Sequence, residues 1–155
     1  SLKAKMAESC AMRVQLMRFS ESVKEERLLS IISDLMSDSE VHGILVELPL
    51  PPHLDETRIL QAIGPSKDVD GFAFANLGRL LAAGGYMYGM EPTARPAVPT
   101  AIMELLLRSG ISLAGKSAAV LGRSNTVGAP VAALLTAHDC TVTICHSRTP
   151  EIESV

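Results

Sequence analysis

The segment that most constrains the fold runs from Ala118 to Gly128, where an apolar stretch meets a glycine, a short polar turn and a second glycine. This pattern is typical of a buried strand that leads directly into a helix. A helix over 127–138 and a second apolar strand over 141–145 complete the arrangement. Strand, helix and strand at this spacing predict a βαβ unit with two parallel strands. The chain is therefore expected to be an α/β protein.

The turn between Gly122 and Gly128 is a candidate phosphate-binding loop. Backbone N–H groups of such a turn, with the positive end of the following helix, suit a pyrophosphate. The spacing here is G-x-x-x-x-x-G instead of the usual G-x-G-x-x-G, and a tight turn that binds no ligand is the alternative. Arg123 and Ser124 are the polar candidates within this loop.

No acidic residue ends the second predicted strand; His146, Ser147 and Arg148 stand there instead. An acid at that place would bind the ribose hydroxyls of NAD, whereas Arg, His and Ser suit the 2′-phosphate of NADP. A solvated loop is the alternative. On the nucleotide interpretation, these residues favour NADP over NAD.

The first half of the chain is expected to alternate helices with extended segments. Ser20–Ser22 offers N-cap oxygens to an amphipathic helix that ends before Asp38, with Glu25 and Glu26 in its first turn. The continuous apolar run from His42 to Leu48 predicts a parallel strand covered on both faces. Further expected elements are a helix over 1–12, a strand over 13–19, a helix capped by Asp55 that runs through Ile63, and a helix from Pro99 to Arg108.

Residues 76–98 are rich in Gly, Pro and Ala, and we interpret them as the connection between two lobes. The predicted domains are an N-terminal α/β lobe over 1–98 and the start of a Rossmann-like lobe over 99–155. Glu47 lies at the end of a predicted strand, where open α/β sheets bind ligands, and Asp70 lies in a loop expected at the same edge. A solvated position is the alternative for each acid, and Lys3 by its spacing alone is a helix-surface lysine.

Composition excludes several classes of protein. Lys plus Arg is 14 and Asp plus Glu is 17, so the net charge is −3 and the basic excess of a nucleic-acid-binding domain is absent. No apolar run approaches the roughly 18 residues of a membrane span. Cys10, Cys140 and Cys145 are too few and too widely spaced for a disulfide framework or a zinc site. We therefore expect no metal, no nucleic acid and no membrane, with buried thiols in a reducing compartment.

Five motifs are spread along nearly the whole chain: VHGILVELPLP over 41–51, KDVDGF over 67–72, NLGRL over 76–80, GRSNTVGAP over 122–130 and TVTICHSRT over 141–149. In this order they resemble the bifunctional methylenetetrahydrofolate dehydrogenase/methenyltetrahydrofolate cyclohydrolase family. The match is far more specific than the glycine spacing, and it makes a generic nucleotide-binding domain of unrelated function the weaker alternative.

The resemblance implies a folate site on the first lobe, an NADP site on the second and a cleft between them. It implies oxidation of 5,10-methylenetetrahydrofolate to 5,10-methenyltetrahydrofolate and hydrolysis to 10-formyltetrahydrofolate. Lys3 matches the lysine of the family's Tyr-x-x-x-Lys motif, and Asp70 matches the acid that holds the pterin. The implied site residues are Lys3, Glu47 and Asp70 for catalysis, Leu48, Pro49 and Asp70 for folate, and Gly122, Arg123, Ser124, Gly128, His146, Ser147 and Arg148 for NADP.

Three departures from the family pattern bear on activity. Glu47 replaces the usual Gln, and a carboxylate beside Lys3 favours the ammonium form, so this departure bears on the hydrolysis step. Pro96 to Ala101 lacks the family's Cys, Thr and Gly, so a catalytically impaired folate- or nucleotide-binding or assembly module is the alternative. The family's tyrosine falls before Ser1 and its chains run past Val155, so we expect a fragment. The resemblance also implies a homodimer in the cytoplasm, with organellar targeting left open.

Overall fold

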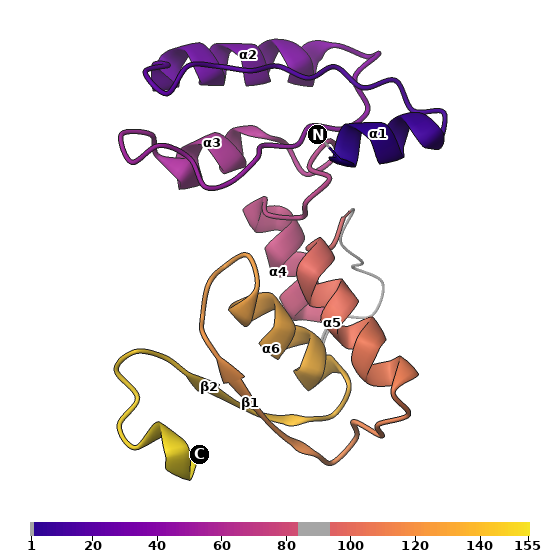
Figure 1. The fold of residues 1–155 in the computed structure, drawn as a ribbon, viewed down its shortest axis with the longest axis vertical. Coiled ribbons are helices and arrows are strands. Elements are labelled where there is room, and N and C mark those ends of the chain that lie inside the picture. Colours follow the sequence, from indigo (N-terminus) through magenta and orange to yellow (C-terminus); the bar gives the residue numbers. More distant parts are fainter. Residues whose placement is uncertain (1, 84–93) are drawn as a thin grey trace.

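The N-terminal part of the molecule consists of helices joined by long irregular segments (Figure 1). A computed structural model describes residues 2–83 and 94–155. Its first helices are α1 (Leu2–Ser9), α2 (Glu25–Ser37) and α3 (Glu56–Ala62). With the loops up to residue 73 they form what we call the N-terminal part. Helices α2 and α3 pack together over a cluster of buried apolar side chains, comprising Ile32, Ile44, Leu54, Ile59 and Ile63.

The predicted amphipathic helix is confirmed as α2, but its expected cap is wrong. The N-cap residue is Lys24, and the hydroxyls of Ser20 and Ser22 face each other at 3.0 Å instead. The serines lie too far before the first helical turn to reach its N–H groups, because a capping side chain bonds two or three residues ahead. The first turn of α2 is used differently, since Glu25 binds the start of α3.

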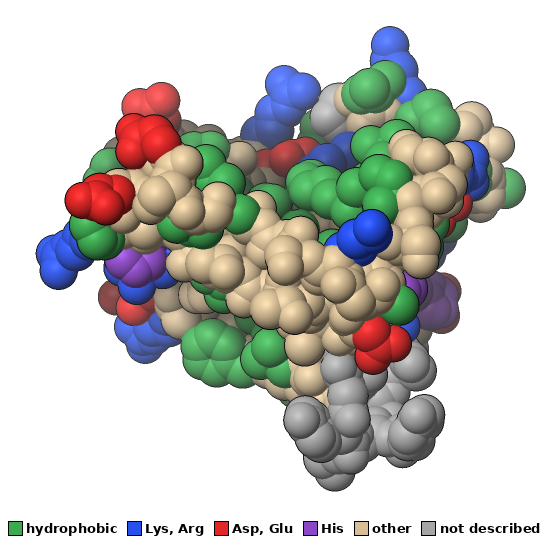
Figure 2. Space-filling view, turned by 90° about the horizontal axis from the view of Figure 1, so that it is seen from below, with side chains coloured by type: hydrophobic (Ala, Val, Ile, Leu, Met, Phe, Trp, Pro, Cys, Tyr) green, Lys and Arg blue, Asp and Glu red, His purple; other side chains and the backbone are tan. Residues whose placement is uncertain are grey.

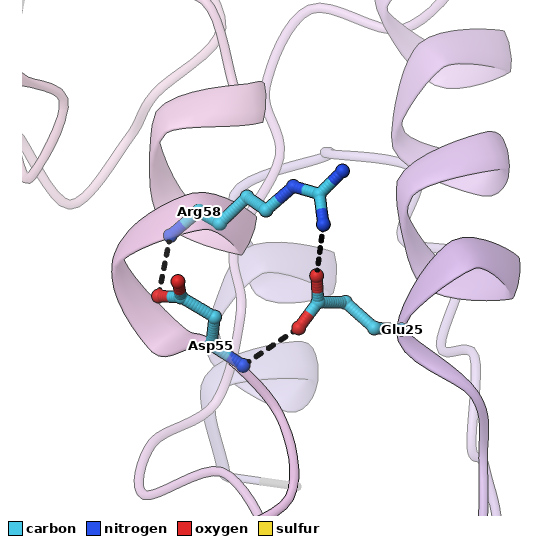
Figure 3. Close-up of polar contacts among 3 residues, drawn as sticks. All are labelled: Glu25, Asp55 and Arg58. Carbon is cyan, nitrogen blue, oxygen red and sulfur yellow. Dashed lines mark hydrogen bonds and ion pairs between the residues drawn. The ribbon is translucent and has the colours of Figure 1, made fainter.

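Glu25 joins the N-termini of α2 and α3 in one network (Figure 3). Its two oxygens accept from the backbone N–H of Asp55 at 2.8 Å and from the guanidinium of Arg58 at 2.7 Å. Asp55 in turn accepts from the backbone N–H of Arg58 at 3.0 Å, which confirms Asp55 as the predicted N-cap of α3. The two helices are therefore fixed at their ends by hydrogen bonds as well as by packing.

Two segments expected as strands form no ladder. Residues 13–19 and 42–48 are irregular, and their one backbone pairing in the described chain is a parallel bridge between Ile44 and Asp68. The strand predictions are therefore wrong. A strand covered on both faces needs neighbouring strands, and the described residues supply none beside these segments. Leu45, Leu16 and Phe19 consequently remain 38%, 52% and 45% exposed.

Part of the predicted connection is a helix. α4 (Phe74–Ala83) covers its first residues, and Leu80 on this helix is buried. Gly and Ala obscured the helical spacing of Leu77, Leu80 and Leu81, so this helix was not predicted. Residues 84–93 lie outside the described residues, and the predicted domain boundary between 98 and 99 stays a prediction.

The C-terminal part, residues 74–83 and 94–155, holds the predicted βαβ unit. β1 (Ser117–Leu121) and β2 (Thr141–Cys145) pair in parallel over their full lengths, and α6 (Gly128–Ala137) connects them. α5 (Ala97–Arg108) begins two residues before Pro99, since the first helical turn has no N–H bonds for a proline to break. Short η1 (Ile152–Ser154) follows β2. The core of this part is a cluster of buried apolar side chains, comprising Leu80, Met103, Leu113, Val131, Leu134, Leu135 and Cys140.

Within the described residues, helices cover one side of the β1–β2 pair and leave the other side uncovered. α6 packs against both strands and against α4 and α5 (Figure 1). Burial alternates along β1, with Ala118 and Val120 covered and Leu121 74% exposed. Figure 2 views this end of the molecule and shows apolar side chains at the surface among charged ones. The chain is an α/β protein whose two-stranded sheet carries helices on a single face.

The cysteines differ in environment. Cys140 and Cys145 are buried as expected, but Cys10 is exposed, so that prediction is wrong for one thiol. Cys10 follows α1, a helix without a buried residue, so nothing covers it. Among the helices of the described residues, none has the length and apolarity that crossing a membrane requires.

Candidate functional site

Lys3 and Glu47 form an ion pair between α1 and the loop after residue 46. The Nζ of Lys3 lies 3.0 Å from the Oε2 of Glu47, and their side chains are 59% and 60% exposed. An exposed pair of this kind contributes only about 0–1 kcal/mol to stability. The contact therefore contributes little to stability, and its main effect is to place an ammonium and a carboxylate side by side at this surface. Leu48 and Pro49 follow directly, joined by a cis peptide bond.

Asp70 lies within electrostatic range of this pair. Burial raises the pKa of Asp70 above its usual value; Lys3 opposes the rise, and the carboxylates of Asp68 and Glu47 add to it. The three residues expected to act in catalysis come from α1 and two separate loops. The structure thus brings Lys3, Glu47 and Asp70 into one charged group.

Two polar residues that the sequence interpretation did not select hold the Asp70 loop. Asp68 accepts from the backbone N–H groups of Gly71 at 2.9 Å and Ala73 at 2.8 Å. Gln61, on α3, donates to the carbonyl of Phe72 at 3.1 Å and accepts from the N–H of Phe74 at 2.7 Å. The D-x-x-G spacing of Asp68 and Gly71 is typical of such a turn, and it is the sequence pattern from which the role of Asp68 could have been predicted. Nothing in the sequence indicated Gln61.

The predicted phosphate loop is a close turn between β1 and α6. Gly122 has φ +126 and donates its N–H to the carbonyl of Cys145 at 2.8 Å. A Cβ on Gly128 would clash with the carbonyl oxygen of Gly122 and lie 2.9 Å from the backbone nitrogen of Arg123. Both glycines are therefore required by the backbone itself, whether or not a ligand binds.

Backbone donors remain available in this loop. The hydroxyl of Ser124 accepts from the N–H groups of Val127 and Gly128, at 3.2 and 3.3 Å. The N–H groups of residues 123–126 donate no hydrogen bond within the described chain. Successive unpaired N–H groups at the end of a strand suit an anion. The loop therefore fits a pyrophosphate group of a dinucleotide.

The turn after β2 lies beside this loop. Leu121 and Cys145 are register partners at the carboxyl ends of the parallel strands, so Arg123 and Arg148 both follow the same sheet edge. His146 accepts at Nδ1 from the N–H of Arg148, at 3.2 Å, and its own N–H donates to the hydroxyl of Thr149. Arg123, Ser147 and Arg148 are exposed, so their side chains are accessible to a phosphate.

A small cavity lies between the loops that support the two groups of residues. It measures about 50 Å³, and its lining includes Gln61, Phe72 and Phe74 from one side and Asn125 and Thr126 from the phosphate loop. This volume suits water and is too small for a cofactor. The predicted residues thus form a charged group on the N-terminal part and a nucleotide group at the sheet edge, with this cavity between their supporting loops.

The fold and these two groups define an α/β protein. It has a βαβ nucleotide-binding unit and, on the N-terminal part, a second site that contains Lys3, Glu47 and Asp70. Residues 1–70 match the family described as tetrahydrofolate dehydrogenase/cyclohydrolase, catalytic domain, and residues 96–155 match its NAD(P)-binding domain. The chain belongs to the tetrahydrofolate dehydrogenase/cyclohydrolase family, which confirms the resemblance.

Curated and solved relatives agree with this assignment. The bifunctional protein FolD of Magnetococcus marinus is 50% identical over 131 residues, 84% of this chain and 44% of that protein. FolD of Bacillus subtilis is 47% identical, over 97% of this chain and 50% of that protein. The crystal structure of the Campylobacter jejuni FolD dehydrogenase/cyclohydrolase superposes with a TM-score of 0.87 at 39% identity, covering 97% of this chain and 51% of that one. The Trypanosoma brucei enzyme, complexed with NADP cofactor and inhibitor, gives 0.86 at 39% identity, covering 96% and 48%. The chain spans about half the length of these relatives.

Proposed function

We propose that this chain supplies the folate site and the start of the NADP site of a methylenetetrahydrofolate dehydrogenase/methenyltetrahydrofolate cyclohydrolase. The observation that carries the proposal is the charged group of Lys3, Glu47 and Asp70, because a family motif and a geometric contact coincide there. The relatives named FolD, and the enzyme complexed with NADP, support the same assignment.

In the first reaction, a hydride leaves the methylene carbon of the folate and a methenyl cation remains. NADP, when bound, supplies the nicotinamide ring that accepts this hydride. The residues of this chain act by holding the two partners in contact. We assign Asp70, with Leu48 and Pro49, to the pterin ring, because a carboxylate accepts hydrogen bonds from its donor edge.

For the nucleotide, we assign the glycine loop to the pyrophosphate and the exposed cations to the 2′-phosphate. The loop contains Gly122, Ser124 and Gly128, and the unpaired N–H groups in it belong to residues 123–126. Arg123 and Arg148 lie at the same sheet edge. The lack of an acid after β2 supports NADP over NAD. His146 and Ser147 belong to the turn after β2, as Arg148 does, and we assign them to the NADP site as well.

In the second reaction, water adds to the methenyl carbon, a ring C–N bond breaks and one proton is released. We assign the movement of this proton to Lys3, which acts as a base only in its neutral form. Glu47 accepts from the Nζ of Lys3 at 3.0 Å and so competes with the folate for this amine. We therefore expect hydrolysis to be the slower of the two activities.

The test is NADPH formation from NADP and 5,10-methylenetetrahydrofolate by the full-length protein. We expect reduction of NADP, with Asp70→Asn weakening folate binding and leaving NADP binding near normal. If the protein binds both ligands and transfers no hydride, the alternative of an impaired binding or assembly module replaces this proposal. The proposed homodimer is checked by light scattering of the same sample, and the proposed cytoplasmic location by fractionation of cells.

A further inference from the structure

One buried carboxylate beside the site has no part in the proposed chemistry. Asp68 is 5% exposed, and its oxygens accept from Gly71 and Ala73 and from the side-chain amide of Asn76, at 2.8–2.9 Å. A buried charge is costly unless hydrogen bonds satisfy it, and three donors satisfy this one. A carboxylate bound in this way favours a single conformation of the loop that supplies its donors.

Two of these donors belong to the turn that carries Asp70. Gly71 follows Asp70 directly and has φ +73, a conformation that residues with a side chain rarely adopt. A Cβ on Gly71 would lie 2.7 Å from the carbonyl oxygen of Ala94 and 3.1 Å from the carbonyl carbon of Arg95. The turn is therefore held from inside by Asp68 and confined from outside by the chain that leads into α5.

The backbone around Asp68 also ties the turn to the segment that carries Glu47. Ile44 and Asp68 form a parallel bridge, in which the N–H of Ile44 donates to the carbonyl of Lys67 at 2.7 Å. Glu47 follows Ile44 by three residues and pairs with Lys3. The backbone on either side of Asp68 thus connects this turn to the segment that carries Glu47, and the Asp68 carboxylate holds the turn itself.

We propose that Asp68 is a positioning residue that holds the turn after it, so that Asp70 faces the folate. The inference rests on the proposed function, and it assigns Asp68 no contact with substrate. Its effect on the reaction passes entirely through Asp70. Loss of the Asp68 carboxylate should therefore raise the KM for the folate selectively, whereas a purely structural role would lower stability and affect both substrates alike.

Asp68→Asn in the full-length protein tests the proposal, because the amide keeps the size of the side chain but loses the charge and one acceptor. We expect the KM for 5,10-methylenetetrahydrofolate to rise about tenfold, and the KM for NADP to stay within about twofold. Asp55→Asn is the matched control, since Asp55 also accepts a backbone N–H but caps α3. It should leave both KM values within about twofold. Parallel rises in both KM values for Asp68→Asn would overturn the proposal.

A double-mutant cycle isolates the route through Asp70. In an Asp70→Asn background, Asp68→Asn should add less than about a twofold further rise in the folate KM, because residues that act together are not additive. Full additivity would overturn the proposal. If Asp68→Asn does not fold, Asn76→Ala removes one donor and should raise the folate KM about threefold in the same direction. An unchanged folate KM in that variant would equally overturn it.

A second readout needs no activity. Burial, Asp68 and Glu47 raise the pKa of Asp70, and Lys3 lowers it. Carbon-13 NMR of the Asp70 carboxyl should therefore show a lower titration midpoint in Asp68→Asn than in the parent protein. An unchanged midpoint would overturn the proposal even in an active enzyme. A lowered midpoint in a protein that binds no folate would support the coupling of Asp68 to Asp70 and overturn the proposed function alone.

Discussion

The two parts of the molecule are stabilised by different kinds of hydrogen bond. In the N-terminal part, side chains bind backbone groups. Lys67 is the clearest case, because its Nζ donates to the carbonyls of Leu35 at 2.9 Å, Met36 at 3.0 Å and Asp38 at 2.6 Å, at the end of α2. In the C-terminal part, backbone binds backbone along the parallel strands β1 and β2.

The difference follows from how far apart in sequence the partners lie. β1, α6 and β2 are contiguous, so the two strands meet at a low entropic cost of loop closure. The extended segments over 13–19 and 42–48 have no strand neighbours among the described residues, and side chains that reach across about thirty residues secure this part instead. A contiguous βαβ pattern is therefore a stronger indication of strands than an isolated apolar run.

The largest effect on stability is expected at Lys67. Lys67→Met keeps the apolar stem but removes three charge-assisted bonds at the C-terminus of α2, so the free energy of unfolding should fall by about 3 kcal/mol. Lys116→Met, at an exposed lysine before β1, should change it by less than about 0.5 kcal/mol. Urea unfolding of both variants measures the difference. Similar losses at the two sites would show that the two parts do not differ in this way.

Arg123→Ala tests the nucleotide group. Removing a charge-assisted contact to the 2′-phosphate should weaken NADP binding by about 1.5–3 kcal/mol and leave NAD binding nearly unchanged. Titration calorimetry with each cofactor gives both values. An equal loss for the two cofactors would refute the role of Arg123 in recognising the phosphate.

Gly128→Ala tests whether the backbone of the phosphate loop tolerates a side chain. The added Cβ would clash with Gly122, so we expect a loss of about 1–3 kcal/mol in stability together with weaker NADP binding. Gly78→Ala is the control, because no atom lies within 4 Å of its Cβ position on α4. That variant should gain about 0.5–1 kcal/mol. Thermal unfolding of both variants measures the two changes in stability. An unchanged stability of Gly128→Ala would contradict the close contact.

Glu47→Gln has a smaller expected effect, because the ion pair is exposed. Removing the carboxylate releases the Nζ of Lys3 from its hydrogen bond, so hydrolysis of methenyltetrahydrofolate at neutral pH should rise a few-fold, about what a pair worth under 1 kcal/mol allows. Dehydrogenase activity should change less, since hydride transfer needs no proton from Lys3. The gain should vanish in Lys3→Met. An unchanged rate of hydrolysis would mean that the pair does not govern this step.

The smallest effect concerns stability against pH. Asp70 has a raised pKa in the folded protein, so the folded state retains a proton that the unfolded state has lost at pH values just above 3.8. Stability should therefore fall as pH rises through the folded pKa. Asp70→Asn removes this dependence and should be more stable than the parent at neutral pH. Thermal unfolding across pH checks the sign, and a less stable variant at neutral pH would contradict it.

The βαβ unit could be predicted almost residue by residue. β2 has the expected bounds, and α6 starts and ends within one residue of the predicted helix over 127–138, because glycine punctuation and apolar runs are local signals. α4 was missed because Gly78 and the alanines lower the apolar contrast on which helical periodicity depends. The N-terminal strands failed because pairing depends on neighbours, which one segment of sequence does not specify.

The charged group shows the same limit. Lys3 and Glu47 lie 44 positions apart, and only the family resemblance indicated that they would meet. Asp70 was selected from its place in the predicted loop and from the KDVDGF motif, whereas Gln61 was passed over because both its partners are backbone atoms. Those atoms are the same in every residue, so sequence patterns carry little information about them.

The exposure of Cys10 makes the protein easy to label. Cys140 and Cys145 are buried, so a maleimide dye should react with the native protein at the end of α1 and nowhere else among its cysteines. Because α1 also carries Lys3, fluorescence from a dye at Cys10 would report the motion of that helix when a ligand is added. Reaction of the other two thiols would then mark unfolding in the same sample.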